Sequence, residues 1–442
     1  MSRIFELAGL MLRNGGIARA FANRNYRIYT SGNAVSLIGT WVQRVATGWL
    51  TWELTQSGTW LGLVAAAEFF PSVFANPLGG AIADRFDRLQ LTRICQSLLA
   101  LQAAVLGVLT LMGLMTPELL FALTFFLGVV TAFNQPARLS LVPSLVRRED
   151  ISAAVAVNSV LWNGARFVGP AVAGVLIVGI GVGWAFLVNA LSYAAFLLAI
   201  HFIHLPPLPA KAKTMGMGRE IVEGFAYVLQ HKGIGPLILL LVLSSVTARP
   251  FAEMLPGFAD DVFGRGADAL AMLTAATGFG AVVGGVWLGQ AGRSTGLTRL
   301  TVWNVLLLAL AILAFAATDW LPFAMVSVAV AGFAMVASGV ATQSQIQSST
   351  DPAMLGRVLS IYGLTFRAGP AIGALAIGGL SEAFGLRLPV AGGAAICILG
   401  WMWAYSRRHQ IEAYLEAPAA SPAATVAAEI PPSRAAPPAA QQ

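Results

Sequence analysis

Charged residues are scarce in this sequence. Asp, Glu, Lys and Arg make up 11% of the 442 residues, whereas 57% are hydrophobic and the mean hydropathy is +0.74. A soluble protein of this length has too little interior to bury so many apolar side chains, so the composition excludes that class. Apolar runs of about 20 residues recur between short polar breaks, which indicates a helical membrane protein with many spans. The runs are apolar all round, which argues against a membrane β-barrel.

Cysteines and recognisable catalytic motifs are equally scarce. The only cysteines, Cys95 and Cys397, fall in predicted helices far apart in the chain, so no disulfide framework is implied. No Gly-Lys-Ser/Thr sequence occurs, which excludes a nucleotide-hydrolysing P-loop. His201 and His204 have no Cys or carboxylate neighbours, so we expect no metal site. Since no nucleophile–base–acid group stands out either, we expect neither an enzyme nor a bound cofactor.

The apolar runs predict twelve transmembrane helices in two bundles of six. Residues 27–204 form the N-terminal bundle and residues 234–406 form the C-terminal bundle. The expected helices of the first bundle are 27–52, 58–82, 91–113, 118–142, 151–179 and 183–204. Those of the second bundle are 234–257, 267–290, 297–317, 320–345, 354–381 and 386–406. We therefore expect an all-α polytopic membrane protein.

Three segments lie outside the two bundles. Residues 1–26 are expected to form a basic amphipathic segment on the cytoplasmic surface of the membrane. Residues 205–233 link the bundles, and apolar residues at helical spacing predict an interfacial helix over 218–231. The Ala- and Pro-rich residues 407–442 are expected to form a disordered cytoplasmic tail.

Lys and Arg indicate the orientation of the chain. The sequence has 27 Lys and Arg against 20 Asp and Glu, a net charge of +7, and the basic residues cluster in alternate loops. This bias marks the cytoplasmic loops of a membrane protein, so the excess does not indicate nucleic-acid binding. The opposite loops hold only Arg265 and Arg387 as basic residues. Both termini and the central linker are therefore expected in the cytoplasm.

The two bundles share short motifs. The stretch "RFVGPAVAG" at 166–174 recurs as "RAGPAIGA" at 367–374, and Arg44 in the first expected helix corresponds to Arg249 in the seventh. Parallel repeats of six helices are a transporter architecture, with the substrate site near the membrane midplane between the halves. The motifs thus predict two pseudo-symmetric bundles around a shared site.

A charged stretch, "GGAIADRFDRLQ", interrupts the apolar sequence. It resembles the loop between helices 2 and 3 of the major facilitator superfamily, and four motif positions match: Gly80, Asp84, Arg85 and Arg88. Asp87 stands where that motif usually has Gly. The resemblance implies the major facilitator fold and a cytoplasmic gate, in which Asp84 faces the positive N-terminal end of helix 11. A positive-inside loop with incidental acids is the alternative interpretation.

A second motif lies in the fifth expected helix. The stretch "NGARFVGPAVAG" is similar to the Gly-Pro motif of exporters in this superfamily, with the matching positions Gly164, Gly169, Pro170 and Gly174. Its small residues permit close helix packing, and the proline removes a backbone hydrogen bond and so allows a bend. Gly-Pro bends also occur in membrane helices of other kinds, so a purely structural role is the alternative.

Longer stretches narrow the resemblance. "NRNYRIYTSGNAVSLIGTWVQRVATGWLTWELTQSGTWLGL" and "LPGFADDVFGRGADALAML" resemble the branch of the superfamily that contains enterobactin exporters and bacterial drug effluxers, and the resemblance spans roughly residues 20–405. It implies a monomeric secondary transporter of the bacterial inner membrane that exports a small amphiphilic solute, drug-like or siderophore-like. The mechanism implied is alternating access with proton antiport. Import, lysophospholipid flipping by the same fold, coupling to sodium, and a non-transporting sensor stay open as alternatives.

Six ionisable side chains in the expected spans form the candidate proton and substrate cavity: Arg44, Glu68, Arg166, Arg249, Glu253 and Arg367. Such groups are costly within a membrane and mark substrate or proton pathways. One interpretation is a basic wall that binds an anionic or catechol-like solute, with stacking surface from Trp41, Trp49 and Trp52. The alternative is neutralisation within two ion pairs, Arg44–Glu68 and Arg249–Glu253, with the tryptophans in the interfacial belt. Pro250 lies between the members of the second pair and is expected to distort that helical turn.

Glu68 is the acid that the sequence places deepest within a span. Burial favours its neutral form and a nearby Arg44 favours its charged form. These opposed effects predict a carboxyl group that exchanges a proton during the transport cycle. The alternative is a permanently ionised Arg44–Glu68 pair that joins helices 1 and 2.

Overall fold

The computed structural model of the chain describes residues 16–85, 87–205, 217–291 and 295–416. Within these ranges, the side chains outside the description are those of residues 72, 74–85, 217–221, 291 and 367. The described backbone is helical, with short turns between the helices and no strand.

The N-terminal half consists of six long helices. They are α3 (Arg24–Thr55), α4 (Gly58–Arg85), α5 (Arg88–Leu111), α6 (Pro117–Leu141), α7 (Ile151–Ile180) and α8 (Val182–His201). Asn23 accepts hydrogen bonds from the first amides of α3, and Thr116 accepts one from Leu119 at the start of α6. Such caps satisfy amides that have no partner within the helix. These helices lie within a few residues of the expected ones.

The C-terminal half repeats this arrangement with one interruption. Its helices are α10 (Ile234–Thr247), α11 (Phe251–Gly257), α12 (Gly266–Ala291), α13 (Leu297–Ala317), α14 (Leu321–Ser349), α15 (Leu355–Phe384) and α16 (Arg387–Ser406). The expected span over 234–257 is present, and its helix is interrupted at Pro250, where the sequence predicts a distorted turn. Pro250 has no amide hydrogen to donate and its ring crowds the preceding turn. As a result α10 ends before it and α11 begins after it, followed by a π-helical turn at Phe258–Val262.

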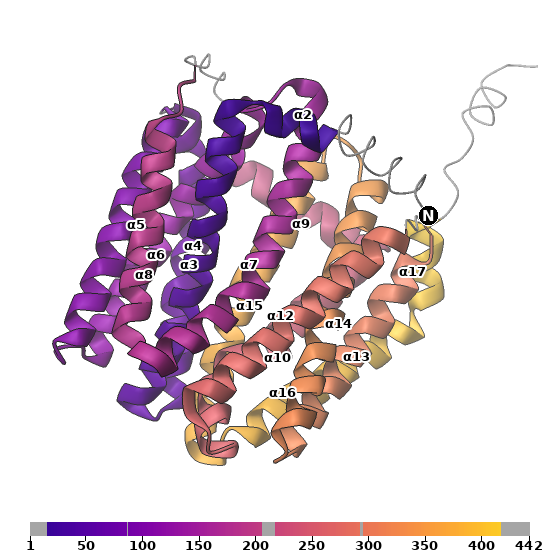
Figure 1. Cartoon of the computed structure of the whole chain (residues 1–442). Coiled ribbons are helices and arrows are strands. Elements are labelled where there is room, and N and C mark those ends of the chain that lie inside the picture. The colour runs from indigo at the N-terminus through magenta and orange to yellow at the C-terminus, as the bar shows by residue number, and fades with distance from the viewer. Residues whose placement is uncertain (1–15, 86, 206–216, 292–294, 417–442) are drawn as a thin grey trace, which may run out of the picture.

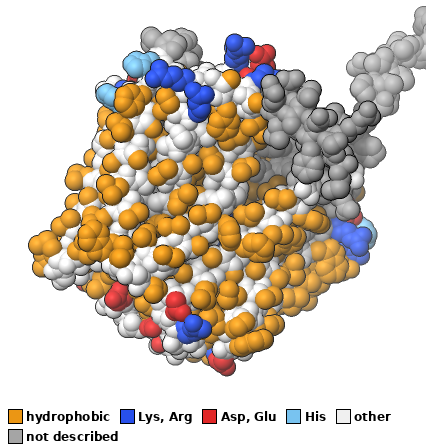
Figure 2. Space-filling view, viewed as in Figure 1, with side chains coloured by type: hydrophobic (Ala, Val, Ile, Leu, Met, Phe, Trp, Pro, Cys, Tyr) orange, Lys and Arg blue, Asp and Glu red, His pale blue; other side chains and the backbone are white. Residues whose placement is uncertain are grey.

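The helices have the length and composition of membrane spans. Ten segments of the described chain are long and apolar enough to cross a membrane. Together with α3 and α4, of 32 and 28 residues, they make up the two bundles of an all-α polytopic membrane protein. α3 is less apolar because it presents polar groups to its neighbours: Gln43 donates to Gln102 of α5 at 3.1 Å and accepts from Asn189 of α8 at 2.6 Å. In Figure 2, apolar side chains cover the middle of the visible face and charged ones gather toward its ends.

Three shorter helices lie at one end of the molecule, which we call the terminal face because both ends of the described chain are there (Figure 1). They are α2 (Gly16–Ala22), α9 (Met217–Gln230) and α17 (Arg408–Leu415). α9 lies where a linker helix is expected, and its Glu223 binds Arg357 of α15 at 2.7 Å. The linker helix is thus attached to the C-terminal half.

The N-terminal segment is attached to the bundle as well as being basic. Arg19 of α2 binds Asp150, next to the start of α7, at 2.9 Å. Ala20 of the same helix is buried. The described part of the expected surface segment therefore packs on protein, and residues 1–15 lie outside the described ranges.

The expectation of disorder over 407–442 is wrong for its first part. Ile411 and Leu415 of α17 are buried, and the carboxylate of Glu416 accepts hydrogen bonds from the amides of Gly296 and Thr298 at the start of α13. The apolar pair and the capping acid give this stretch contacts that the Ala- and Pro-rich composition farther on does not offer. The rest of the expected tail lies outside the described residues.

The two halves meet near the end opposite to the terminal face, which we call the distal face. Gly58 of α4 lies so close to α15 that a side chain there would overlap it, and a Cβ at Gly174 of α7 would overlap Ala271 of α12. Small residues permit such close packing between membrane helices. Trp52 of α3 donates from Nε1 to Asp260 Oδ2 of the C-terminal half at 2.9 Å. The described residues thus hold the halves together at the distal face.

Candidate functional site

An ion pair joins the two halves within the distal part of the molecule. Arg44 Nη2, on α3, lies 2.7 Å from Glu253 Oε1, on α11. Arg44 Nη1 lies 3.9 Å from Glu68 Oε1, on α4 of its own half. All three side chains are about one quarter exposed, at 28%, 21% and 27% for Arg44, Glu253 and Glu68. One guanidinium therefore serves two carboxylates, with the tighter contact across the interface; we call these residues the charge cluster.

Aromatic rings surround the charge cluster. The Arg44 guanidinium lies 5.3 Å from the centre of the Trp41 ring and 4.8 Å from that of Phe69. Arg166 of α7 approaches the same Trp41 ring at 5.6 Å. Cations at such distances are attracted by the electron-rich ring faces. The structure thus brings two of the four expected arginines, Arg44 and Arg166, to the same indole ring.

The three expected tryptophans take part in contacts between helices. Trp41 packs against Arg44 of the charge cluster, and its ring lies 6.4 Å from that of Trp162 on α7. Trp52 is 2% exposed and donates to Asp260 of the other half. Trp49 is partly buried and lies next to Gly266 at the start of α12. These residues help to form the contact between the halves.

Arg249 is separate from the charge cluster. It is 6% exposed, and its guanidinium lies 4.2 Å from the Phe366 ring centre and donates to the Met335 carbonyl at 3.4 Å. The alternative pair Arg249–Glu253 is wrong, because the break at Pro250 turns Glu253 toward Arg44. The sequence correspondence of Arg44 and Arg249 is therefore not matched by equivalent contacts. The Arg367 side chain lies outside the described residues.

The Gly-Pro motif shapes two helix contacts. α7 continues through Pro170 as one helix. A Cβ at Gly169 would overlap Trp41, and one at Gly174 would overlap Ala271 across the interface, whereas a Cβ at Gly164 would meet no described neighbour within 4 Å. Gly169 therefore lets α7 approach Trp41 beside the charge cluster, and Gly174 lets the two halves approach each other.

The gate motif lies at the terminal face, where α4 ends and α5 begins. Gly80, Asp84 and Arg85 are in the last turns of α4, and their side chains lie outside the described residues. Arg88 donates to the Ser140 carbonyl at 3.3 Å. Asp87, the departure from the family pattern, accepts from the amides of the first turn of α5. The acid in place of glycine is thus a helix cap.

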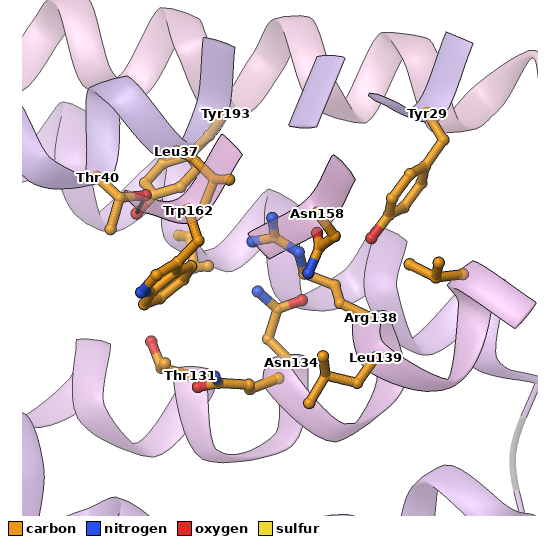
Figure 3. A pocket seen from close by; sticks show the side chains of 13 residues that line it. Tyr29, Leu37, Thr40, Thr131, Asn134, Arg138, Leu139, Asn158, Trp162 and Tyr193 are labelled. Carbon is orange, nitrogen blue, oxygen red and sulfur yellow. Dashed lines mark hydrogen bonds between the residues drawn. The ribbon is translucent and has the colours of Figure 1, made fainter. Parts of the chain in front are cut away.

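A polar pocket in the N-terminal half contains residues that the sequence did not single out. Helices α3, α5, α6, α7 and α8 form it, and its polar lining includes Tyr29, Thr40, Asn134, Arg138, Asn158 and Tyr193. Figure 3 shows Arg138, Asn134 and Asn158 pointing toward one another, with Trp162 to one side and Tyr29 to the other. Arg138 was missed because it lies only four residues before the expected end of its helix, where a basic residue reads as part of a cytoplasmic loop.

Comparisons with known proteins agree with this architecture. A family model described as "Transmembrane secretion effector" matches residues 17–436. Macrolide efflux protein A of Streptococcus pyogenes is 24% identical over 350 residues, which cover 78% of this chain and 86% of the relative. The enterobactin exporter EntS of Escherichia coli O1:K1 / APEC is 26% identical over 324 residues, or 72% of this chain and 75% of the relative. The staphyloferrin A transporter of Staphylococcus aureus (strain NCTC 8325 / PS 47) is 25% identical over 241 residues, which cover 54% of this chain and 60% of that protein. The expected branch of the superfamily is confirmed.

Solved structures of transporters share the fold. A bacterial homolog of the human lysosomal transporter Spinster, in an inward-facing and unoccupied conformation, aligns with a TM-score of 0.70 and 15% identity over 92% of this chain and all of that chain (100%). The nucleoside transporter NupG aligns with a TM-score of 0.65 and 14% identity over 89% of this chain and 100% of its own. At these identities the likeness concerns the fold alone, and it confirms the expected major facilitator architecture.

Proposed function

Because the chain belongs to the transmembrane secretion effector family of the major facilitator superfamily, we propose that it exports a small amphiphilic solute by alternating access, driven by inward flow of protons. Its relatives include proteins named as a macrolide efflux protein and an enterobactin exporter, which supports this direction. The Lys and Arg bias supports a cytoplasmic terminal face, with the chain in a bacterial inner membrane. On this orientation, the distal contact closes the external side.

The observation that carries the proposal is the ion pair between Arg44 and Glu253. It joins the halves on the external side, at 2.7 Å, so it must break when that side opens. Arg44 keeps a second partner in its own half, since Glu68 lies 3.9 Å away. Opening therefore does not leave the Arg44 guanidinium unpaired in the membrane, which would be costly. The cluster thus has a stable arrangement in each of the two states.

The charge balance of the cluster supplies the coupling. Closing the external side brings two carboxylates, Glu68 and Glu253, to one guanidinium in a site where each side chain is about one quarter exposed. Two carboxylates sharing a site disfavour each other's ionised forms. Closure therefore favours uptake of one proton, and Glu68 is its acceptor because its contact with Arg44 is the looser one. The proton leaves when the inward-facing cavity fills with water and solute, which makes the exchange an antiport.

Transport in inside-out vesicles tests this proposal. A panel that contains a macrolide, an aromatic carboxylate and a citrate derivative is offered with an imposed pH gradient and with an ionophore control. We expect uphill uptake of at least one solute into the vesicles, and its loss with the ionophore. Glu68→Gln should keep solute exchange but lose uphill uptake, because Gln accepts a hydrogen bond and cannot titrate.

The control is Glu118→Gln, which removes an exposed acid at the start of α6 in the same half. It should transport like the unmodified protein. Uphill transport at the unmodified rate in a folded Glu68→Gln protein would exclude Glu68 as the proton site. Net movement of a solute in the opposite direction would indicate an importer. Transfer of a labelled lysophospholipid would indicate a flippase, and movement of neither kind of molecule would indicate a sensor. Transport that does not respond to the pH gradient but depends on sodium would show that sodium, rather than the proton, is the coupling ion.

A further inference from the structure

The polar pocket of the N-terminal half holds an arginine that has no acidic partner among the described residues. Arg138, near the terminal-face end of α6, contacts Asn33 Oδ1 and lies 5.1 Å from the Phe196 ring centre. Among the residues that the structure describes, no carboxylate forms an ion pair with it. A cation in this position needs a negative partner to offset the loss of water. The pocket is therefore suited to an anion.

A second group in the pocket lacks a partner as well. Asn134, one helical turn before Arg138 on α6, is 4% exposed, and its Oδ1 has no hydrogen-bond partner in the described structure. An acceptor that is buried without a donor costs about 1–3 kcal/mol. The neighbouring amide of Asn158 is engaged, since it accepts from Asn33 at 3.3 Å. Asn134 Oδ1 is thus available to accept a hydrogen bond from a hydroxyl or N–H group of a bound molecule.

The remaining lining provides a flat apolar surface of suitable size. Trp162 is 42% exposed although it lines the pocket, so its indole face is available. The Thr40 hydroxyl donates to the Ser36 carbonyl at 2.8 Å and lies 3.2 Å from the Tyr193 hydroxyl, from which it can accept a hydrogen bond. The cavity volume is about 90 Å³, measured as the space open to the centre of a water-sized sphere. One water needs about 10–15 Å³ on that measure, so the cavity admits one substituted ring with the rest of a larger solute outside.

From these groups we propose that the pocket binds a carboxylate-bearing, hydroxylated aromatic group of the solute. Arg138 binds the carboxylate, Asn134 Oδ1 accepts a hydrogen bond from the hydroxyl, and the Trp162 indole stacks on the ring. The assignment rests on the proposed export function and names the class of solute for it. It moves the anion site from the arginines of the charge cluster to a residue nearer the terminal face.

The pocket is connected to the charge cluster through two tryptophans. Trp162 lies 6.4 Å from Trp41, whose ring carries Arg44 at 5.3 Å and Arg166 at 5.6 Å. The pocket and the charge cluster thus share one aromatic contact, between Trp162 and Trp41.

Direct binding to the purified full chain tests the assignment without any gradient. Isothermal titration calorimetry in nanodiscs compares three probes: 3-hydroxybenzoate, benzoate and methyl 3-hydroxybenzoate. Arg138→Gln should weaken binding of both carboxylates by at least about tenfold, because a charge-assisted contact is lost, and leave the ester unchanged. Asn134→Leu should reduce the affinity for 3-hydroxybenzoate to that for benzoate, without changing the latter. Arg147→Gln, which removes an exposed charge in the loop after α6, is the matched control and should bind like the unmodified protein.

Equal losses for acid and ester, or no loss in either variant, would overturn the assignment. If Arg138→Gln unfolds, Arg138→Lys keeps the charge without the planar fork; it should retain part of the preference for acid over ester, and loss of that preference would count against the proposal. The binding results are independent of coupling. Intact binding with no export in vesicles would refute the proposed function alone, whereas export with unchanged binding in both pocket variants would refute this site alone.

Discussion

The ion pair between Arg44 and Glu253 should control the balance between the two states of the transporter. Glu253→Gln removes the charge and keeps the shape of the side chain. Gln still accepts a hydrogen bond from Arg44, so the closed external side loses the difference between a charge-assisted and a neutral bond. That difference is about 1–2 kcal/mol for a partly exposed pair. A loss of that size changes a two-state population ratio by roughly 5- to 30-fold.

Distances between spin labels at the distal face measure this ratio. Labels at Met112 and Leu388, which are 63% and 65% exposed and lie in different halves, report separation of the external ends. Cys95 and Cys397 are buried and are replaced by Ala for this purpose. Glu253→Gln should raise the long-distance population roughly 5- to 30-fold over that of the unmodified protein.

The matched control is Asp268→Asn, which removes an acid whose partner, Arg265 at 3.1 Å, lies in the same half. It should leave the distance distribution unchanged, since no contact between the halves is altered. An unchanged distribution in Glu253→Gln would mean that Arg44 and Glu253 stay paired in both states. An equal change in both variants would show that the net charge of the distal face, rather than the pair, sets the balance. Either result would refute the reasoning.

Two further predictions concern other contacts. Gly174→Val should prevent the external side from closing, because the new side chain overlaps Ala271. It should therefore raise the labelling, from outside, of a cysteine placed at Met112. Gly164→Val makes the same change of helix propensity without a close neighbour among the described residues, so it should not raise this labelling. The second prediction concerns His231, whose Nδ1 accepts hydrogen bonds from the amides of Gly233 and Ile234, at the start of α10, at 3.1 and 3.0 Å. Burial holds the pKa of His231 below its ordinary 6.5. The stability that neutral His231 contributes is therefore complete above pH 6.5 and is lost as the pH falls through the lower folded-state pKa. Between pH 7.5 and pH 5, the thermal unfolding midpoint of His231→Asn should fall less than that of the unmodified protein. Parallel curves for the two proteins would contradict this.

The span pattern could be predicted from composition because each span is a local property. A run of apolar residues must be helical in a membrane whatever it packs against, so the ends of α5, α13 and α16 lie close to their expected positions. The exception has a local cause too. Pro250 predicts a distorted turn but not the size of the break, since neighbouring helices decide whether a membrane helix bends at a proline or stops there.

The polar pocket could not be predicted in the same way. Its lining comes from five helices of one half, and no single helix carries more than a fraction of it. Asn134 and Arg138 lie one turn apart on α6, which is a signal in the sequence. An Asn and an Arg at that spacing near a helix end nevertheless look like part of a polar boundary. Only the packing of α3 and α7 against them shows that one stays buried without a partner among the described residues.

The partner of Arg44 shows why some contacts of a transporter are not fixed by sequence alone. Glu68 was the expected partner because depth along a helix can be counted from its ends, and that count relates residues of the same half. Glu253 lies at a similar position relative to the distal face, but its approach to Arg44 depends on how the halves are docked, which is the variable that the transport cycle changes. Arg44 therefore has two carboxylate partners, Glu68 at 3.9 Å within its own half and Glu253 at 2.7 Å across the interface, and each pairing suits one of the two states. A single sequence that must support both docked arrangements has to encode both partners, and the structure of one state shows which of them it favours.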